Sequence, residues 1–199
     1  MSTEEFAATP VLEHRLVRLV PLEPAHEQEL IAAASIGELW KTWYLRHVPA
    51  PDAMGKEIAR LLDQQQQGKQ APYAVTDPAS GKALGVTTFM NLDATNKRLE
   101  IGSTWLGREA QGTGINLAMK YLMLQRAFEV LDCNAVELRT HWHNHQSRAA
   151  IAKLGAKQDG VLRNHILFPD GHIRDTVVFS ILNTEWPSVR NGLNHRLEA

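Results

Sequence analysis

Apolar and polar residues alternate along some stretches of the chain and recur every three to four positions along others. "RLVRLVPL" alternates and predicts a half-buried strand. "EPAHEQELIAAAS" and "DAMGKEIARLLDQQQQ" have a helical pattern, and the aromatic segment "GELWKTWYLRHVP" between them is irregular. Three further strands are expected in "PYAVTD", "KALGVTTFMNLD" and "RLEIGSTWL", because turn signals separate these stretches.

The second half of the chain continues with helices and strands in alternation. "INLAMKYLMLQRAFEVL" is an amphipathic helix, "AVELRTHWH" is rich in strand-forming residues, and "NHQSRAAIAKLGA" is helical. "GVLRNHILF" and "RDTVVFSIL" form a hairpin around "PDG", and "TEWPSVRNGLNHRLEA" is a terminal helix. The order is strand, two helices, three strands, helix, strand, helix and two strands, which predicts an α/β fold with a mixed sheet.

Composition narrows the class of protein. The chain has 199 residues, 44% hydrophobic and 22% charged, which predicts a single domain over 1–199, with a core at about 15–186 and a C-terminal helical tail. The net charge of -1 gives no basic surplus for nucleic acid, and no apolar run suits a membrane helix. The acidic N-terminus lacks a signal layout, so we expect a cytoplasmic protein without nucleic-acid or membrane partners. Cys133 is the only cysteine and is expected to be a packing residue.

A glycine-rich turn, "REAQGTGINLAMK", stands between a strand and a helix. The first N–H groups of a helix have no internal partners, and glycines let a phosphate approach them closely. The alternative is that the glycines only provide a sharp entry into the helix. Lys120, one helical turn beyond Asn116, either adds positive charge for phosphates or lies on a solvated face.

This element order, with "QGTGIN" at the turn, resembles the GNAT superfamily of acetyl-CoA-dependent N-acetyltransferases. The pyrophosphate loop of that family reads Gln/Arg-x-x-Gly-x-Gly/Ala, and Gln111, Gly114 and Asn116 hold its three defined positions. The asparagine departs from the motif, as it does in the RimJ/RimL-like branch. "LEIGSTWL", "NHQSRAAIAKLGA" and "GVLRNH…DGHIRDTVVFSIL" extend the similarity to that branch from about Arg15 to Trp186.

The resemblance implies a GNAT-type, mostly antiparallel central sheet flanked by helices, with splayed fourth and fifth strands. It also implies acetyl-CoA as a co-substrate, with pantetheine between those strands, and no metal. The implied CoA-binding residues are Trp105, Leu106, Gln111, Gly112, Thr113, Gly114, Ile115, Asn116, Asn144 and Ser147.

The resemblance further implies direct attack of an amine on the thioester in a ternary complex. Where many members have a tyrosine as the acid toward the thiolate, this chain has Ile151. The branch offers a serine in an N-x-x-S motif instead, so Asn144 would hold the pantetheine amide and Ser147 would hydrogen-bond the sulfur. Both residues also suit helix caps on physical grounds alone.

The general base is expected to be Glu100 on the fourth strand, several residues upstream of a splay at 103–106. His165 on the sixth strand is the second candidate, because an ordinary histidine titrates at about pH 6.5. The structural alternatives are a salt bridge from Glu100 to Arg98 or Lys97, and a half-exposed strand position for His165.

Trp40, Trp43 and Tyr44 occupy the helix connection that borders the acceptor cleft in GNAT folds, and ordinary core packing is the alternative for each. The acceptor would be a protein or peptide N-terminus or a small-molecule amine, and the fold allows a homodimer. A non-catalytic acyl-CoA-binding module is the competing function. A metal site at His141 and His143, on one strand face, is weaker than polar packing because no carboxylate lies at ligand spacing.

Overall fold

One eight-stranded sheet organises the protein, in a computed structural model that describes residues 2–168 and 170–198. The strand order is β1-β2-β3-β4-β5-β6-β8-β7, and β5 pairs with β6 in parallel while the other neighbours are antiparallel. This confirms the predicted mostly antiparallel α/β sheet. The strands are β1 Leu12–His14, β2 Val17–Pro21, β3 Gln70–Thr76, β4 Ala83–Asp93, β5 Arg98–Leu106, β6 Ala135–His141, β7 Lys157–Leu167 and β8 Ile173–Leu182.

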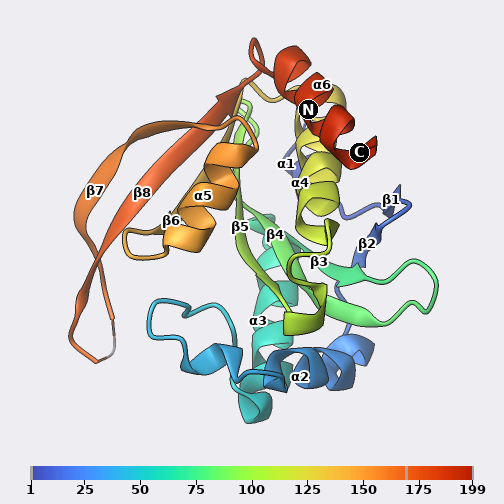
Figure 1. The fold of residues 1–199 in the computed structure, drawn as a ribbon, viewed down its shortest axis with the longest axis vertical. Helices are drawn as coiled ribbons and strands as arrows, with labels where there is room; N and C mark the ends of the chain where they lie inside the picture. Colours follow the sequence, from blue (N-terminus) through green and yellow to red (C-terminus); the bar gives the residue numbers. More distant parts are fainter. Residues whose placement is uncertain (1, 169, 199) are drawn as a thin grey trace.

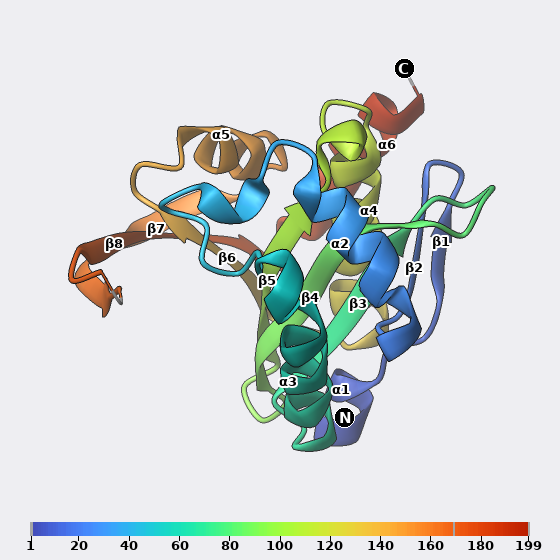
Figure 2. The ribbon, with the colours of Figure 1, turned by 90° about the horizontal axis from the view of Figure 1, so that it is seen from below.

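Helices cover both faces of the sheet and bury a hydrophobic core on each (Figures 1 and 2). The α-helices are α1 Thr3–Ala7, α2 Glu27–Ser35, α3 Met54–Gln66, α4 Ile115–Gln125, α5 His145–Lys153 and α6 Trp186–Glu198. Helices α1, α4, α5 and α6 contribute to the larger core, and α2 and α3 contribute to the smaller one. In the described part of the chain, no helix has the length and apolar run that a membrane span needs.

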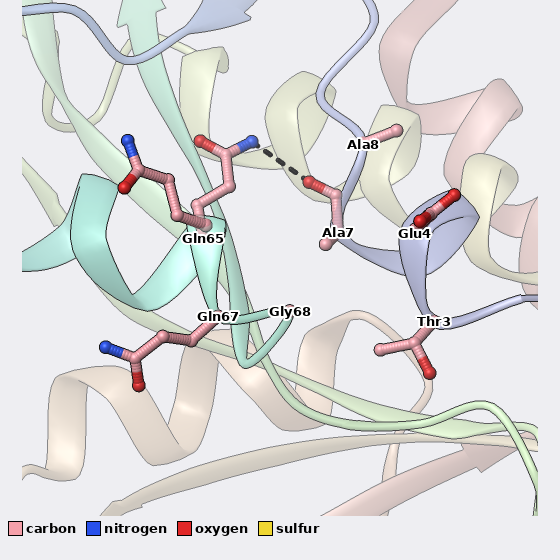
Figure 3. Close-up of a pocket in the computed structure, with 8 residues that line it drawn as sticks. Thr3, Glu4, Ala7, Ala8, Gln65, Gln67 and Gly68 are labelled. Carbon is pink, nitrogen blue, oxygen red and sulfur yellow. Dashed lines mark hydrogen bonds between the residues drawn. The ribbon is translucent and has the colours of Figure 1, made fainter.

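The N-terminal residues add two elements that the sequence pattern did not predict, α1 and β1. Phe6 of α1 is completely buried in the larger core, and a capping box between Ser2 and Glu5 closes the start of the helix. Figure 3 shows Gln65 at the end of α3 donating its amide to the carbonyl of Ala7, at 2.9 Å. The short helix is therefore fixed to the body of the domain by an aromatic anchor and by backbone contacts.

Strands β5 and β6 form only three residue pairs, from Arg98↔Ala135 to Glu100↔Glu137. Beyond Glu100 the two strands separate. A β-bulge at Ser103, with φ 46°, re-aims the end of β5, so that Ile101 packs in the larger core and Trp105, four residues on, packs in the smaller one. The separation thus begins directly after Glu100, which corrects the expectation that Glu100 lies several residues upstream of it.

Candidate active site

A cleft of about 740 Å³ occupies the place where β5 and β6 separate. On one face of the sheet it runs between α4 and α5, which Figure 1 shows on either side of β5. On the other face it is bordered by the connection between α2 and α3 and by the β7–β8 hairpin. The cleft therefore joins the two faces of the sheet through the gap between the strands.

The glycine-rich turn forms one end of this cleft. Gly112 and Gly114 have φ of 76° and 86°, a region that favours glycine, and α4 begins at the next residue without a side-chain cap. The Gln111 amide donates to the Leu106 carbonyl at 2.9 Å, and the Thr113 hydroxyl donates to the Ala110 carbonyl at 2.7 Å. Because these side chains fold back on the turn, its backbone amides are left at the positive end of the α4 dipole.

The predicted CoA-binding residues divide into two groups by position. Those that line the cleft are Trp105, Leu106, Gln111, Gly112, Asn116, Asn144 and Ser147. Thr113, Gly114 and Ile115 belong to the same turn but are not among the cleft-lining residues.

The start of α5 forms the wall opposite α4. Asn144 is its N-cap, and its side-chain oxygen accepts the backbone N–H of Ser147 at 3.0 Å. The Ser147 hydroxyl has no hydrogen-bond partner within the described residues, and Ser147 lines the cleft. Ile151, where the resemblance implies a tyrosine in many members, is buried and also lines the cleft. The cap is confirmed for Asn144, and the chemical role of Ser147 stays a prediction.

Glu100 lies on the opposite face of the sheet from α4, in the last residue pair before β5 and β6 separate. Its side chain is buried, and it accepts a hydrogen bond from the Asn91 amide at 2.7 Å and faces Arg139 Nε at 3.4 Å. Burial raises the pKa of Glu100, and the Arg139 charge and the Asn91 hydrogen bond oppose that rise. Glu100 is thus a carboxylate that takes up a proton more readily than an exposed glutamate.

The salt bridges expected as an alternative for Glu100 are not formed. Lys97 pairs with Asp132 at 2.6 Å, and Arg98 pairs with Glu137 of β6 at 2.6 Å. Lys97 lies in the turn before β5, with φ 53°, and Asp132 lies just after the π-helical segment 126–130 that extends α4. Arg139, two strand residues after Glu137, is the cation beside Glu100.

The remaining predicted site residues belong to β7 and to the connection between α2 and α3, on the side of the sheet opposite α4. His165 of β7 is exposed, lines the cleft and bonds through Nδ1 with the Thr176 hydroxyl at 3.0 Å. Tyr44 also lines the cleft. Trp43 is 55% exposed and packs its ring edge against His141, with ring centroids 5.0 Å apart. Trp40 packs on the smaller core and is not among the cleft-lining residues.

His141 and His143 do not share a strand face, because β6 ends at His141 and His143 follows in the turn. The backbone N–H of His143 donates to Nδ1 of His141 at 3.0 Å. Burial lowers the pKa of His141 to about 4, so its ring is neutral at pH 7. Within the described residues, no group of three or more His, Cys, Asp or Glu side chains is placed to hold a metal.

Cys133 is 1% exposed, and burial raises the pKa of its thiol to about 12. A thiol in that state is inert at neutral pH. The packing role expected from the sequence is confirmed.

Lys120 does not lie on a solvated face, which corrects one of the two expectations for it. Its side chain is 6% exposed, and Nζ donates to the Thr104 hydroxyl at 2.7 Å. The helical spacing of the sequence indicates this burial. Asn116, Lys120 and Met123 lie on one face of α4, and Met123 is completely buried. A charge on an inward-facing stripe should have indicated a buried lysine.

Comparison with known proteins agrees with this geometry. Residues 16–157 match the model of the acetyltransferase (GNAT) domain family. A putative ribosomal N-acetyltransferase, YdaF of Bacillus subtilis, is 34% identical over 106 residues, which are 53% of this chain and 57% of that relative.

Two solved structures illustrate the similarity of the fold. A GCN5-related N-acetyltransferase from Brucella melitensis superimposes with a TM-score of 0.85 at 31% identity, covering 96% of this chain and 86% of that one. Mycobacterium smegmatis RimJ, in complex with CoA-disulfide, has the same fold with a TM-score of 0.75 at 20% identity, covering 94% and 93% of the two chains. The chain therefore belongs to the GNAT family of acetyltransferases.

Proposed function

We propose that the protein transfers the acetyl group of acetyl-CoA to a primary amine by direct attack of the amine in a ternary complex. The amine is a protein N-terminus or a small-molecule amine. The observation that carries this proposal is the cleft that passes through the sheet where β5 and β6 separate. It provides one entrance for each of two substrates that must meet at a single point.

The side of the cleft between α4 and α5 suits acetyl-CoA. The turn at 112–114 offers backbone amides to phosphate oxygens, and a Cβ added at Gly112 would meet no atom within 4 Å. Beyond Glu100, β5 pairs with no β6 residue in the described part of the chain. The carbonyls of Gly102, Thr104 and Leu106 already have side-chain partners, so the remaining β5 backbone groups are the ones available to the amides of pantetheine. Asn144 and Ser147 line the opposite wall. Acetyl-CoA supplies an acetyl group activated as a thioester.

The side bordered by the α2–α3 connection suits the amine. Glu100 faces this side and is the proposed base, acting directly or through a water, because burial has raised its pKa toward the range in which a carboxylate removes protons effectively. His165 is the second candidate base. Tyr44 lines the cleft, and the exposed Trp43 packs against the cleft-lining His141, so both would contact the body of the acceptor.

A peptide N-terminus heads the acceptor candidates because the Bacillus subtilis relative is described as a putative ribosomal N-acetyltransferase. An amine panel tests the proposal: short peptides with free N-termini, the same peptides with blocked N-termini and an internal lysine, and small-molecule amines. We expect amine-dependent release of CoA thiol and a mass increase of one acetyl group on the amine.

The buried Cys133 should not contribute to the thiol signal. Folded protein that binds CoA but releases no thiol with any amine would contradict the proposal and favour a non-catalytic acyl-CoA-binding module.

A further inference from the structure

Lys120 is a buried cationic side chain in the wall of the cleft, and neither the glycine turn nor Glu100 accounts for it. It projects from the second turn of α4, on the face where α4 and α5 border the cleft. Its Nζ donates to the Thr104 hydroxyl at 2.7 Å, and that hydroxyl lies 2.7 Å from the Thr87 hydroxyl. The ammonium is therefore held beside the unpaired part of β5, just past the bulge.

A buried lysine is costly unless it is paired or used. Within the described residues, no carboxylate oxygen lies within ion-pair distance of Lys120 Nζ, and the single hydrogen bond to the Thr104 hydroxyl does not repay the loss of hydration. The charged group that acts on it is Glu100, which favours its protonated form. His47 bonds to the Thr104 carbonyl at 3.0 Å, and burial, with a smaller contribution from Lys120, lowers the pKa of that histidine. A structural role thus explains little of its position.

We propose that Lys120 is the proton donor to the sulfur of CoA as the acetyl group leaves. The proposal rests on the proposed function, because it requires acetyl-CoA in the channel between α4 and α5. Lys120 lies on that side of the sheet, whereas Glu100 faces the acceptor side, so the two groups divide the acid and base tasks. On the other wall Ile151 provides no hydroxyl, and Ser147 is the residue whose hydroxyl would hydrogen-bond the sulfur there.

The proton and electron balance is complete with these groups. The amine nitrogen forms a bond to the acetyl carbon and gives up one proton to Glu100 or to a water that Glu100 holds. The carbon–sulfur bond breaks with its electron pair on sulfur, and Lys120 passes a proton to that sulfur. Lys120 is left as a neutral amine and takes a proton back from solvent after CoA departs. Burial lowers the pKa of Lys120 to about 7, so both of its forms are accessible at neutral pH.

The test measures the pKa of the thiol of bound CoA, and no amine acceptor is present. An ammonium beside the sulfur stabilises the thiolate, so the thiol of bound CoA should have a lower pKa than the thiol of free CoA in the same buffer. The thiolate absorbance of the CoA complex is followed against pH, with the desulfo-CoA complex subtracted. We expect a thiol pKa lowered by about one unit or more in the wild type, restored in Lys120→Met, and still lowered in Lys153→Met, an exposed lysine of α5.

Lys120→Arg separates a proton donor from a fixed charge. An arginine keeps the charge but does not release a proton near neutral pH, so it should keep the thiol pKa low while turnover falls at least tenfold. An unchanged thiol pKa in folded Lys120→Met, or full turnover in Lys120→Arg, would overturn the assignment. Failure of both CoA and desulfo-CoA to bind the wild type, measured by calorimetry, would instead overturn the proposed function and this inference with it.

Discussion

Glu100 is buried, accepts a hydrogen bond from the Asn91 amide and lies near the guanidinium groups of Arg139 and Arg174, at the point where β5 and β6 part. Replacement by glutamine keeps the shape and removes the basicity. We expect Glu100→Gln to bind CoA normally and to lose turnover near neutral pH by on the order of a hundredfold, with partial recovery at higher pH, where the amine is already deprotonated. Because burial raises the pKa of Glu100, this base is protonated at a higher pH than an exposed glutamate is. The activity of the wild type should therefore begin to fall at that higher pH as the pH is lowered.

The pH dependence of kcat/KM checks this, with the exposed strand residue changed in Glu13→Gln as the control. Full activity of Glu100→Gln together with loss in His165→Ala would move the role to the histidine. Full activity of both Glu100→Gln and His165→Ala would mean that neither residue is the base and that water removes the proton from the amine.

Ser147 allows a clean test because its cap interaction uses only its backbone N–H. Ser147→Ala therefore leaves the start of α5 intact and removes only the hydroxyl beside the cleft. If that hydroxyl acts on the departing sulfur, kcat should fall more than the KM for acetyl-CoA rises. Ser188→Ala is a matched control, since Ser188 is the third residue of α6 as Ser147 is of α5, and it is exposed. An unchanged kcat in Ser147→Ala would leave the residue without a chemical role.

At the scale of elements, the short helix α1 depends on packing. A helix of 5 residues is unstable alone, so the burial of Phe6 must hold it. Phe6→Ala should lower the free energy of unfolding by about 3–5 kcal/mol, as expected for a fully buried phenylalanine. Urea unfolding measures this, and Val11→Ala, at a residue that is 44% exposed, should change stability by about 0.5 kcal/mol or less. A loss below about 1 kcal/mol in Phe6→Ala would show that α1 contributes little to stability.

The elements that the sequence predicted are those with clear periodicity or clear turn signals. β5 was predicted with the bounds it has, because a strand pattern lies between "DATNK" and the glycine turn. α1 and β1 were missed because 5 and 3 residues are too few to show a period, and their stability comes from contacts with distant segments. Local pattern cannot report such contacts.

At the scale of the whole molecule, the sequence order and the resemblance predicted the sheet, the gap between β5 and β6 and the turn at its end. They did not predict which side chains meet across the gap. Lys120 joins Thr104 from a different element, and Arg139 reaches Glu100 from the neighbouring strand. Both contacts depend on the bulge at Ser103 and on where the strands part, which no single segment encodes.

The central claim is that the glycine turn and the gap together bind CoA, and calorimetric titration of CoA tests it most directly. Gly114 has φ 86°, and an added Cβ would only touch Leu16 at 3.4 Å, so Gly114→Val mainly strains and blocks the turn. Gly81→Val carries the same kind of backbone strain, at φ 74°, in the β3–β4 turn. We predict CoA affinity at least tenfold weaker in Gly114→Val, about 1.4 kcal/mol, and unchanged in Gly81→Val. Undiminished CoA affinity in folded Gly114→Val protein would contradict the account.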